Sequence, residues 1–250
     1  MNETLREEGP QIYHAMYLAA QRLSPVDAAH YRIGTAVHRR IAGEPSAIVI
    51  PREVLSKNGQ RRGAAWTAYA DSHAGECLVT QKDGIEIDNI CEAILANRQA
   101  RRLIEHSRLK EQSIFWRCDE TDLERKCRPD ALLPGLIVDI KTTRIRNPDP
   151  QRFGKAAIGL GYHRQGAYYA DGVADLVGER WRPIYIIASK VPPYCVYVSG
   201  WDSDALDLGR RQVATTLRQL AEYYEADSWK DPATETITTL EVPRWAWDEI

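Results

Sequence analysis

The chain has 250 residues, of which 44% are apolar and 27% are charged, and its formal net charge is −2 at pH 7. This composition is typical of a globular protein with a sizeable core, and no apolar run approaches the roughly 18 residues that a membrane span needs. The charge argues against a protein that coats nucleic acid by bulk electrostatics, but it leaves open an acidic site whose charge is offset by local basic patches.

The N-terminal part, residues 1–108, is predicted to be mostly helical. Its second helix contains His38, and an imidazole commonly supplements carboxylates at a catalytic metal. A lone helical histidine is more often a packed or surface residue, so both interpretations of His38 stay open. Apolar spacing and a break at Ser24-Pro25 predict helices over 11–23, 26–43, 64–72, 84–95 and 100–105, with a short strand over 47–51.

Residues 109–201 are predicted to form a catalytic sheet with one helix. The order of the elements implies a mixed central sheet flanked by helices, an α/β fold with an N-terminal helical elaboration. A long amphipathic helix and a tryptophan-rich tail follow over 202–250. No linker is convincing, so we expect a single domain over 1–250. The predicted strands cover 111–118, 125–132, 136–141, 181–189 and 194–201, and the helices cover 156–174 and 202–227.

Asp130, Asp139 and Lys141 carry the strongest chemical signal of the chain. Residues i and i+2 of a strand project from the same face, so Asp139 and Lys141 would stand side by side with Asp130 nearby. Two acids can hold a divalent metal, and a lysine can position a water or stabilise charge on a phosphate, which indicates metal-dependent phosphodiester hydrolysis. The alternative is that these residues form surface ion pairs at a strand edge. It is less favoured, because a charge beside the apolar run 136–138 needs a partner or a metal.

Glu111 and the pair Gln165 and Tyr169 are the next candidates. Glu111 begins a mostly apolar predicted strand, where its carboxylate could face the same metal or could be a surface charge at a strand end. Gln165 and Tyr169 are four residues apart on one helix face. They could hydrogen-bond a phosphate or hold Lys141, or they could simply pack on the sheet.

A basic segment follows the strand that carries Lys141. Its cations could contact DNA beside the suspected site, or they could form a solvated loop. An earlier cluster over 98–110 has the same two interpretations. The predicted DNA-binding residues are Arg144, Arg146, Arg152, Lys155 and Arg164.

The five cysteines are scattered and form no C-x-x-C pair, so a zinc site or a disulfide framework is not expected. The N-terminus is polar and acidic and lacks the basic and apolar regions of a secretion signal. We therefore expect a cytoplasmic protein.

Five motifs occur in a characteristic order and spacing. The chain resembles the PD-(D/E)xK nuclease superfamily, and specifically the catalytic domain of the RecE-type exonuclease (exonuclease VIII). The matching motifs are GTAVH (34–38), E-x-S (111–113), CRPD (127–130), VDIKTT (138–143) and FGKAAIGLGYHRQGAYY (153–169).

The resemblance implies a role for each candidate residue. Lys141 would position the attacking water and stabilise charge on phosphorus. Gln165 and Tyr169 match a Q-x-x-x-Y helix motif that contacts DNA near the cut or supports the lysine. The implied Mg²⁺ ligands, with Mn²⁺ as a substitute ion, are His38, Asp130, Asp139 and the backbone carbonyl of Ile140, and Glu111 would join them directly or through water.

The resemblance also implies an activity and partners. The family degrades linear duplex DNA processively from 5′ ends and leaves a 3′ single strand for an annealing recombinase, and RecE-type members form rings, with tetramers as the expected size. A bacterial or phage-encoded cytoplasmic enzyme is implied. Two alternatives stay open: a related nuclease with another polarity or with single-strand or structure specificity, and a catalytically inactive DNA-end-binding protein. Only Cys195 lies beyond the catalytic core, so no iron–sulfur cluster is expected.

Overall fold

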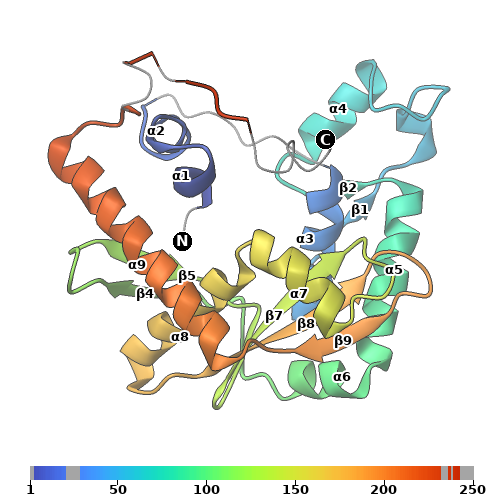
Figure 1. The fold of residues 1–250 in the computed structure, drawn as a ribbon. Coiled ribbons are helices and arrows are strands. Elements are labelled where there is room, and N and C mark those ends of the chain that lie inside the picture. The colour runs from blue at the N-terminus through green and yellow to red at the C-terminus, as the bar shows by residue number, and fades with distance from the viewer. Residues whose placement is uncertain (1–2, 21–28, 232–235, 238, 243–250) are drawn as a thin grey trace. The chain divides into compact units, whose positions relative to one another are not determined.

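The computed structural model describes residues 3–20, 29–231, 236–237 and 239–242 (Figure 1). The chain forms two compact units, of which the first covers residues 26–213 together with Met1, and the second covers 2–25 and 214–250. Within the described ranges, every helix is too short or too polar to cross a membrane. The predicted break at Ser24-Pro25 lies outside the described residues.

The first unit contains a five-stranded sheet in the order β3-β6-β7-β8-β9. The central pair β7 and β8 is parallel, with Lys141 level with Ile187 and Thr143 level with Ser189, and the other neighbouring pairs are antiparallel. The mixed sheet confirms the predicted α/β fold class. The strands are β3 (Leu109–Lys110), β6 (Ala131–Leu133), β7 (Leu136–Thr143), β8 (Arg182–Ser189) and β9 (Val196–Ser199).

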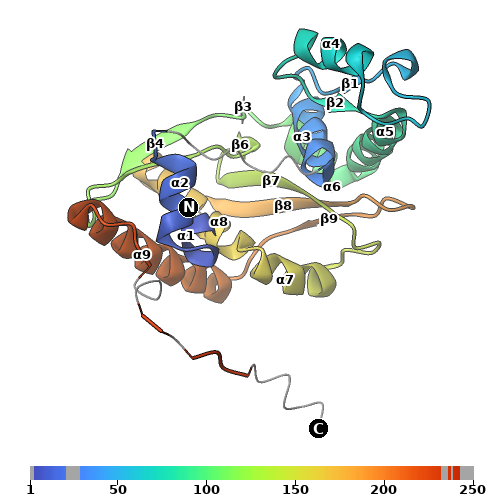
Figure 2. The ribbon, with the colours of Figure 1, turned by 90° about the horizontal axis from the view of Figure 1, so that it is seen from above.

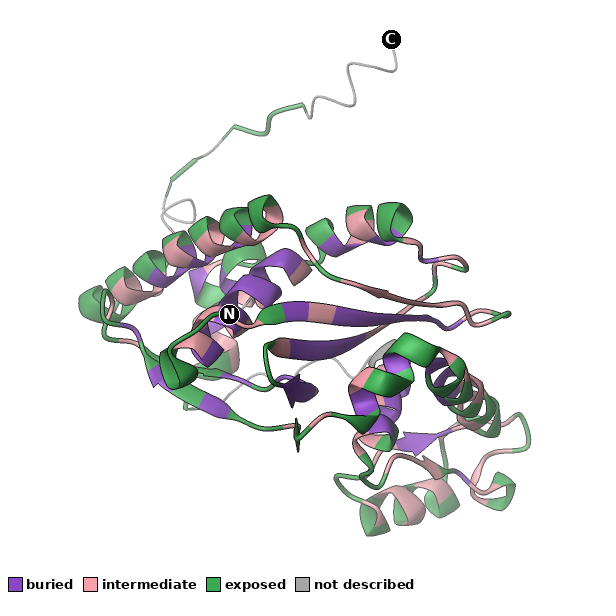
Figure 3. Ribbon diagram, turned by 90° about the horizontal axis from the view of Figure 1, so that it is seen from below, coloured by how far each residue is buried: buried purple, intermediate pink, exposed green. Residues whose placement is uncertain are grey.

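Helices cover both faces of this sheet (Figure 2). On one face, Val138 and Ile140 of β7 belong to a buried cluster with apolar residues of α3 (Ala29–Ala42), α5 (Gln81–Ala96) and α6 (Arg98–Glu105). The opposite face of β8 packs on α7 (Pro150–Gly159), and α8 (Tyr162–Val177) also contacts β8 there. Strand β8 is buried over most of its length, and β7 is buried over residues 137–140 (Figure 3).

Strand alternation decides where the charged residues of β7 point. Because Val138 and Ile140 face α3 and α5, Asp139 and Lys141 project toward α7 and α8. The side chains at the start of α8 can therefore reach them.

The two predicted strands 111–118 and 125–132 are each interrupted. Their outer parts, β4 (Ile114–Arg117) and β5 (Glu124–Cys127), pair in a separate two-stranded sheet, whereas β3 and β6 join the central one. The breaks lie opposite each other, since Glu111 has a φ of 50° and its N–H donates to Asp130 O over 3.1 Å. The prediction of two continuous strands is wrong because Glu111 takes a left-handed conformation and Pro129 offers no N–H to a ladder.

The predicted helix over 156–174 is two helices, α7 and α8. Gly161 lies between them with a φ of 73°, a left-handed conformation that ends α7 and redirects the chain. As a result Tyr162 occupies the first position of α8, directly above the face of β7 that carries Lys141.

The rest of the first unit is a small peripheral segment and the start of α9 (Ser203–Ala226). The short parallel strands β1 (Ile48–Val49) and β2 (Leu78–Val79) pair, and β2 is not among the predicted strands. Between them lie η1 (Arg52–Val54) and α4 (Ala64–Ser72). The predicted helices 64–72, 84–95, 100–105 and 202–227 are all present within a few residues of their expected bounds.

The second unit contains α1 (Glu3–Glu7), α2 (Pro10–Tyr17) and the C-terminal part of α9. Its aromatic side chains gather around Trp229, whose ring stacks on Tyr13 at a centroid distance of 5.7 Å and lies 5.0 Å from the ring of Tyr224. The other two tryptophans of the predicted tail, Trp245 and Trp247, lie outside the described residues.

Candidate active site

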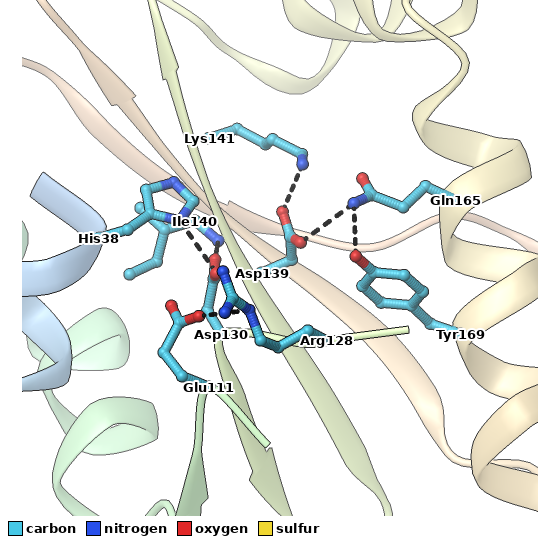
Figure 4. Close-up of polar contacts among 9 residues, drawn as sticks. All are labelled: His38, Glu111, Arg128, Asp130, Asp139, Ile140, Lys141, Gln165 and Tyr169. Atoms are coloured by element: carbon cyan, nitrogen blue, oxygen red, sulfur yellow. Dashed lines mark hydrogen bonds and ion pairs between the residues drawn. The ribbon is translucent and has the colours of Figure 1, made fainter. Parts of the chain in front are cut away.

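Asp130 occupies the edge of the central sheet just before β6 begins. One of its carboxylate oxygens accepts a hydrogen bond from the backbone N–H of Ile140 on β7, and the other lies 2.9 Å from His38 Nδ1 on α3. A single carboxylate therefore links a helix on one face of the sheet to the backbone of β7 (Figure 4).

Glu111 reaches the same place from the interruption between β3 and β4. Its carboxylate lies 3.1 Å from Arg128 Nε, and its side chain is 17% exposed. Burial and the charge of Asp130 raise the pKa of Glu111, although Arg128 opposes them. The left-handed backbone of Glu111 is the kind of strained conformation that persists where the surrounding structure holds a functional side chain.

His38, Glu111 and Asp130 form a cluster in which one ligand atom from each lies within 4.8 Å of the others. Two ligands on one octahedral ion with bonds of about 2.1 Å are about 3.0 Å apart when adjacent and about 4.2 Å apart when opposite. The His38–Asp130 separation of 2.9 Å matches the adjacent case. The donor set therefore fits a small divalent cation.

The electrostatics of the cluster favour a positive charge. Burial lowers the pKa of His38, but the hydrogen bond to Asp130 and the charges of Asp130 and Asp139 outweigh it, so the pKa is raised above its usual 6.5. A cation placed among these ligands would replace the proton that His38 and Asp130 share.

Lys141 and Asp139 form a buried ion pair on the other face of β7. Lys141 Nζ lies 2.6 Å from Asp139 Oδ2 and 4.4 Å from the centre of the Tyr162 ring. Gln165 Nε2 donates to Asp139 Oδ1 over 3.4 Å and to the hydroxyl oxygen of Tyr169 over 3.0 Å. Lys141, Asp139, Gln165 and Tyr169 thus form one continuous polar chain (Figure 4).

Lys141 and Asp139 each act on the pKa of the other. Burial acts against the charged form of Lys141, but the adjacent carboxylate of Asp139 prevails and raises the lysine pKa. Burial raises the pKa of the Tyr169 hydroxyl well above its usual range, with a contribution from the charge of Asp139. Lys141 is therefore held as an ammonium, and Tyr169 as a neutral phenol.

The structure does not bring Asp139 into the three-residue cluster. Its carboxylate is directed toward Lys141 and Gln165, although its charge still acts on His38 and Asp130. The Ile140 N–H points at Asp130, and a strand residue presents its N–H and C=O on the same side, so the Ile140 carbonyl also faces Asp130. Its role as a metal ligand stays a prediction.

The cluster and the lysine open into one cavity of about 1050 Å³. The acidic residues share its wall with cations and hydroxyl groups. The cavity can therefore bind an anionic group together with a metal ion. Its lining residues include His38, Glu111, Arg128, Asp130, Ile140, Lys141, Thr143, Arg144, Tyr162 and Lys190.

The predicted DNA-binding cations divide into three kinds. Arg144 lines the cavity. Arg146, Arg152 and Lys155 are exposed on the following loop and on α7. Arg164 is 4% exposed, and its guanidinium donates to Gln212 Oε1 on α9 over 3.4 Å. The prediction that Arg164 contacts DNA is therefore wrong, because the close packing of α9 on α8 buries it.

Lys190, Arg39 and Thr35 also line the cavity, and sequence reasoning missed all three. A signal for Lys190 exists in the sequence: it directly follows an apolar strand that pairs in parallel with the strand of Asp139, and ligands bind at the carboxyl ends of such strands. No comparable signal points to Arg39 or Thr35, which face the cavity because of the way α3 packs on the sheet.

A family model described as "PDDEXK-like domain of unknown function (DUF3799)" matches residues 67–238. The chain belongs to this family. The matched range contains every candidate residue named above from Glu111 to Tyr169, whereas His38 lies before it. The family membership confirms the predicted PD-(D/E)xK superfamily, while the narrower RecE type remains a prediction.

A crystal structure described as a "Putative exonuclease" from Eubacterium rectale has a similar fold, with a TM-score of 0.60. The two sequences are 13% identical, and the similarity covers 96% of this chain and 85% of that chain. At this level of identity the similarity concerns the fold. The comparison with curated proteins gave no match.

Proposed function

We propose that the protein is a Mg²⁺-dependent exodeoxyribonuclease that degrades linear double-stranded DNA in the 5′→3′ direction and leaves 3′ single-stranded tails for recombination. The observation that carries the proposal is the convergence of His38, Glu111 and Asp130 within 4.8 Å, with Lys141 on the wall of the same cavity. Membership of a PDDEXK-like family supports phosphodiester hydrolysis as the reaction.

His38, Glu111 and Asp130 are the proposed ligands of the ion, together with the Ile140 carbonyl. Two carboxylates suit Mg²⁺, and the imidazole makes Mn²⁺ an equally acceptable substitute. Asp139 is the fifth proposed protein ligand, because its charge raises the pKa of His38 and so reaches the cluster. A divalent ion bound there would lower the pKa of a water and neutralise charge on the phosphate.

Lys141 is the proposed catalytic cation of the protein itself. Asp139 and the Tyr162 ring fix its ammonium at the cavity wall, where it can donate to a phosphate oxygen and orient a water. Gln165 and Tyr169 act as positioning residues, because the Gln165 amide donates to the Asp139 oxygen that Lys141 leaves free, and the Tyr169 hydroxyl accepts a hydrogen bond from the same amide.

The cations near the cavity are the proposed contacts to the DNA backbone. Arg144 lies in the wall, and Arg146, Arg152 and Lys155 follow it on an exposed loop and helix. The polarity of degradation, the homo-oligomeric ring with a tetramer as its expected size, and the partner recombinase come into the proposal from the resemblance to the RecE type. Light scattering measures the oligomer directly.

Digestion of end-labelled DNA tests the proposed activity. Linear duplex should lose its 5′ label first in Mg²⁺ or Mn²⁺, closed circular duplex should survive, and EDTA should stop the reaction. Lys141→Met and Glu111→Gln should each slow the reaction by about 100-fold or more, because the first removes a cation at the phosphate and the second weakens the binding of the ion. Lys82→Met, at an exposed lysine of α5, is the control and should match the wild type.

Each alternative gives a distinct result in the same assay. Early loss of the 3′ label indicates a nuclease of the other polarity. Digestion of single strands in preference to duplex indicates a different substrate. Binding of DNA ends without any metal-dependent loss of label indicates an end-binding protein and refutes the proposed enzyme.

A further inference from the structure

Lys190 is a buried cation in the wall of the active-site cavity. It directly follows the last residue of β8, and its backbone N–H donates to Thr143 O over 2.7 Å, which fixes it beside the end of β7. The residue is 8% exposed, and it lines the same cavity as the metal-binding cluster and Lys141. The sheet therefore holds Lys190 rigidly at the carboxyl ends of its two parallel strands.

The ammonium of Lys190 forms no hydrogen bond and no ion pair within the part of the chain that the structure describes. Burial and the charge of Arg144 lower its pKa, and the charge of Glu86 opposes them without an ion pair being formed. The Lys190 side chain is largely buried and its ammonium reaches only the cavity, so an ammonium that is partly desolvated and lacks a bonded anion is unfavourable. An anion in the cavity would relieve this cost.

The position of Lys190 along the sheet separates it from the catalytic lysine. Lys141 is level with Ile187 on β8, so Lys190 lies three residues farther along. At about 3.3 Å per residue this is roughly 10 Å of strand. Arg144 lies at the same end of β7 and also lines the cavity. Lys190 and Arg144 thus lie in the cavity wall at the carboxyl ends of the two parallel strands, beyond Lys141.

We propose that Lys190, together with Arg144, binds a second phosphoryl group of the DNA, which is distinct from the phosphoryl group that is hydrolysed. This inference rests on the proposed function and names a second phosphate subsite within its active site. The group is either a neighbouring diester or a terminal monoester, since both present the same anionic oxygens. Contacts to phosphate fix the register of a nucleic acid, so this subsite would place the reacting phosphate at Lys141 and the metal cluster.

Fluorescence anisotropy of a labelled duplex, with Ca²⁺ in place of Mg²⁺ and intact DNA checked on a gel, tests the subsite. Lys190→Met should raise Kd about tenfold and reduce the slope of log affinity against log salt concentration by about one, the signature of one lost phosphate contact. Lys190→Arg should retain most of the affinity. The control Lys82→Met removes an equal charge outside the cavity and should change neither quantity.

The ends of the duplex identify the phosphate. A loss confined to 5′-phosphorylated duplex assigns the terminal monoester, and an equal loss on 5′-hydroxyl duplex assigns the diester. If Lys190→Met matches Lys82→Met in affinity and salt slope on both duplexes, the subsite does not exist. If Lys190→Met lowers the unfolding temperature without changing the salt slope, and Glu86→Gln does the same, Lys190 has a structural role beside Glu86. That result would also overturn the proposal.

The failure of the proposed function gives a different result. A wild-type protein that binds duplex but never cleaves it in Mg²⁺ or Mn²⁺ refutes the nuclease and leaves the phosphate subsite supported by its own measurements. A wild-type protein that binds no duplex refutes both.

Discussion

At the scale of single residues, Asp130 and Asp139 have different roles beside β7. Asp130 lies at the sheet edge and connects the backbone of Ile140 to His38, so it organises the cluster that fits a metal. Asp139 lies on the face toward α8 and holds Lys141. The sequence spacing predicts that Asp139 and Lys141 are neighbours, and this follows from strand geometry alone. It does not reveal the orientation of the Asp139 carboxylate, which depends on Gln165 from a distant helix.

Asp139→Asn tests whether Asp139 binds the metal as well as Lys141. We expect a drop of at least about tenfold in metal affinity and a loss of several orders of magnitude in the rate of hydrolysis, because a carboxylate ligand and the anchor of Lys141 are removed together. Calorimetric titration with Mn²⁺ measures the affinity. Asp88→Asn, which disrupts an ion pair with Arg40 on the surface, is the matched control. An unchanged Mn²⁺ affinity in Asp139→Asn would restrict Asp139 to holding Lys141.

At the scale of elements, the periodic segments were predictable and the interruptions were not. The buried strand β7 and the helices α4, α5 and α9 follow from apolar spacing, because burial of one face imposes that spacing. The break at Glu111 comes with a tertiary contact, the hydrogen bond of its N–H to Asp130 O, whereas Pro129 and Gly161 are local breakers within an otherwise continuous pattern. The same breaks bring Glu111, Asp130 and Tyr162 to the cavity, so the local pattern fails where the candidate site is built.

The close approach of β4 to α8 gives a prediction for the stability of this part of the fold. A Cβ added to Gly172 on α8 would lie 2.6 Å from the Trp116 ring, so Gly172→Ala should destabilise the protein by about 1–3 kcal/mol through overpacking. The matched control is Gly154→Ala on α7, where an added Cβ meets nothing within 4 Å. That change should stabilise the protein by about 0.5–1 kcal/mol through helix propensity. Chemical denaturation measures both, and equal effects of the two substitutions would contradict the tight packing at Gly172.

At the scale of the whole molecule, the near-neutral net charge conceals a concentration of charges of both signs in one cavity. The acidic cluster shares the cavity wall with cations, among them Arg128, Lys141, Arg144 and Lys190. The total charge of −2 argues against bulk attraction as the main source of the proposed affinity for DNA, so in the proposed function that affinity comes from the arrangement of a few cations and a metal. Binding of a metal to the folded protein should also influence the stability of the fold.

The pH dependence of unfolding tests this coupling between metal, proton and fold. The folded-state pKa of His38 is raised above 6.5, so the stability that its proton contributes is fully present below pH 6.5 and is lost as the pH rises through the folded pKa. In EDTA the unfolding temperature should fall across this range. Mn²⁺ takes the place of the proton, so the stabilisation that it gives should increase with pH and reach about 2.7 kcal/mol at a concentration of about 100 times Kd. Differential scanning calorimetry of the wild type and His38→Gln measures both trends. If the unfolding temperature changes with pH by the same slope in His38→Gln as in the wild type, His38 is not the group that links proton and metal.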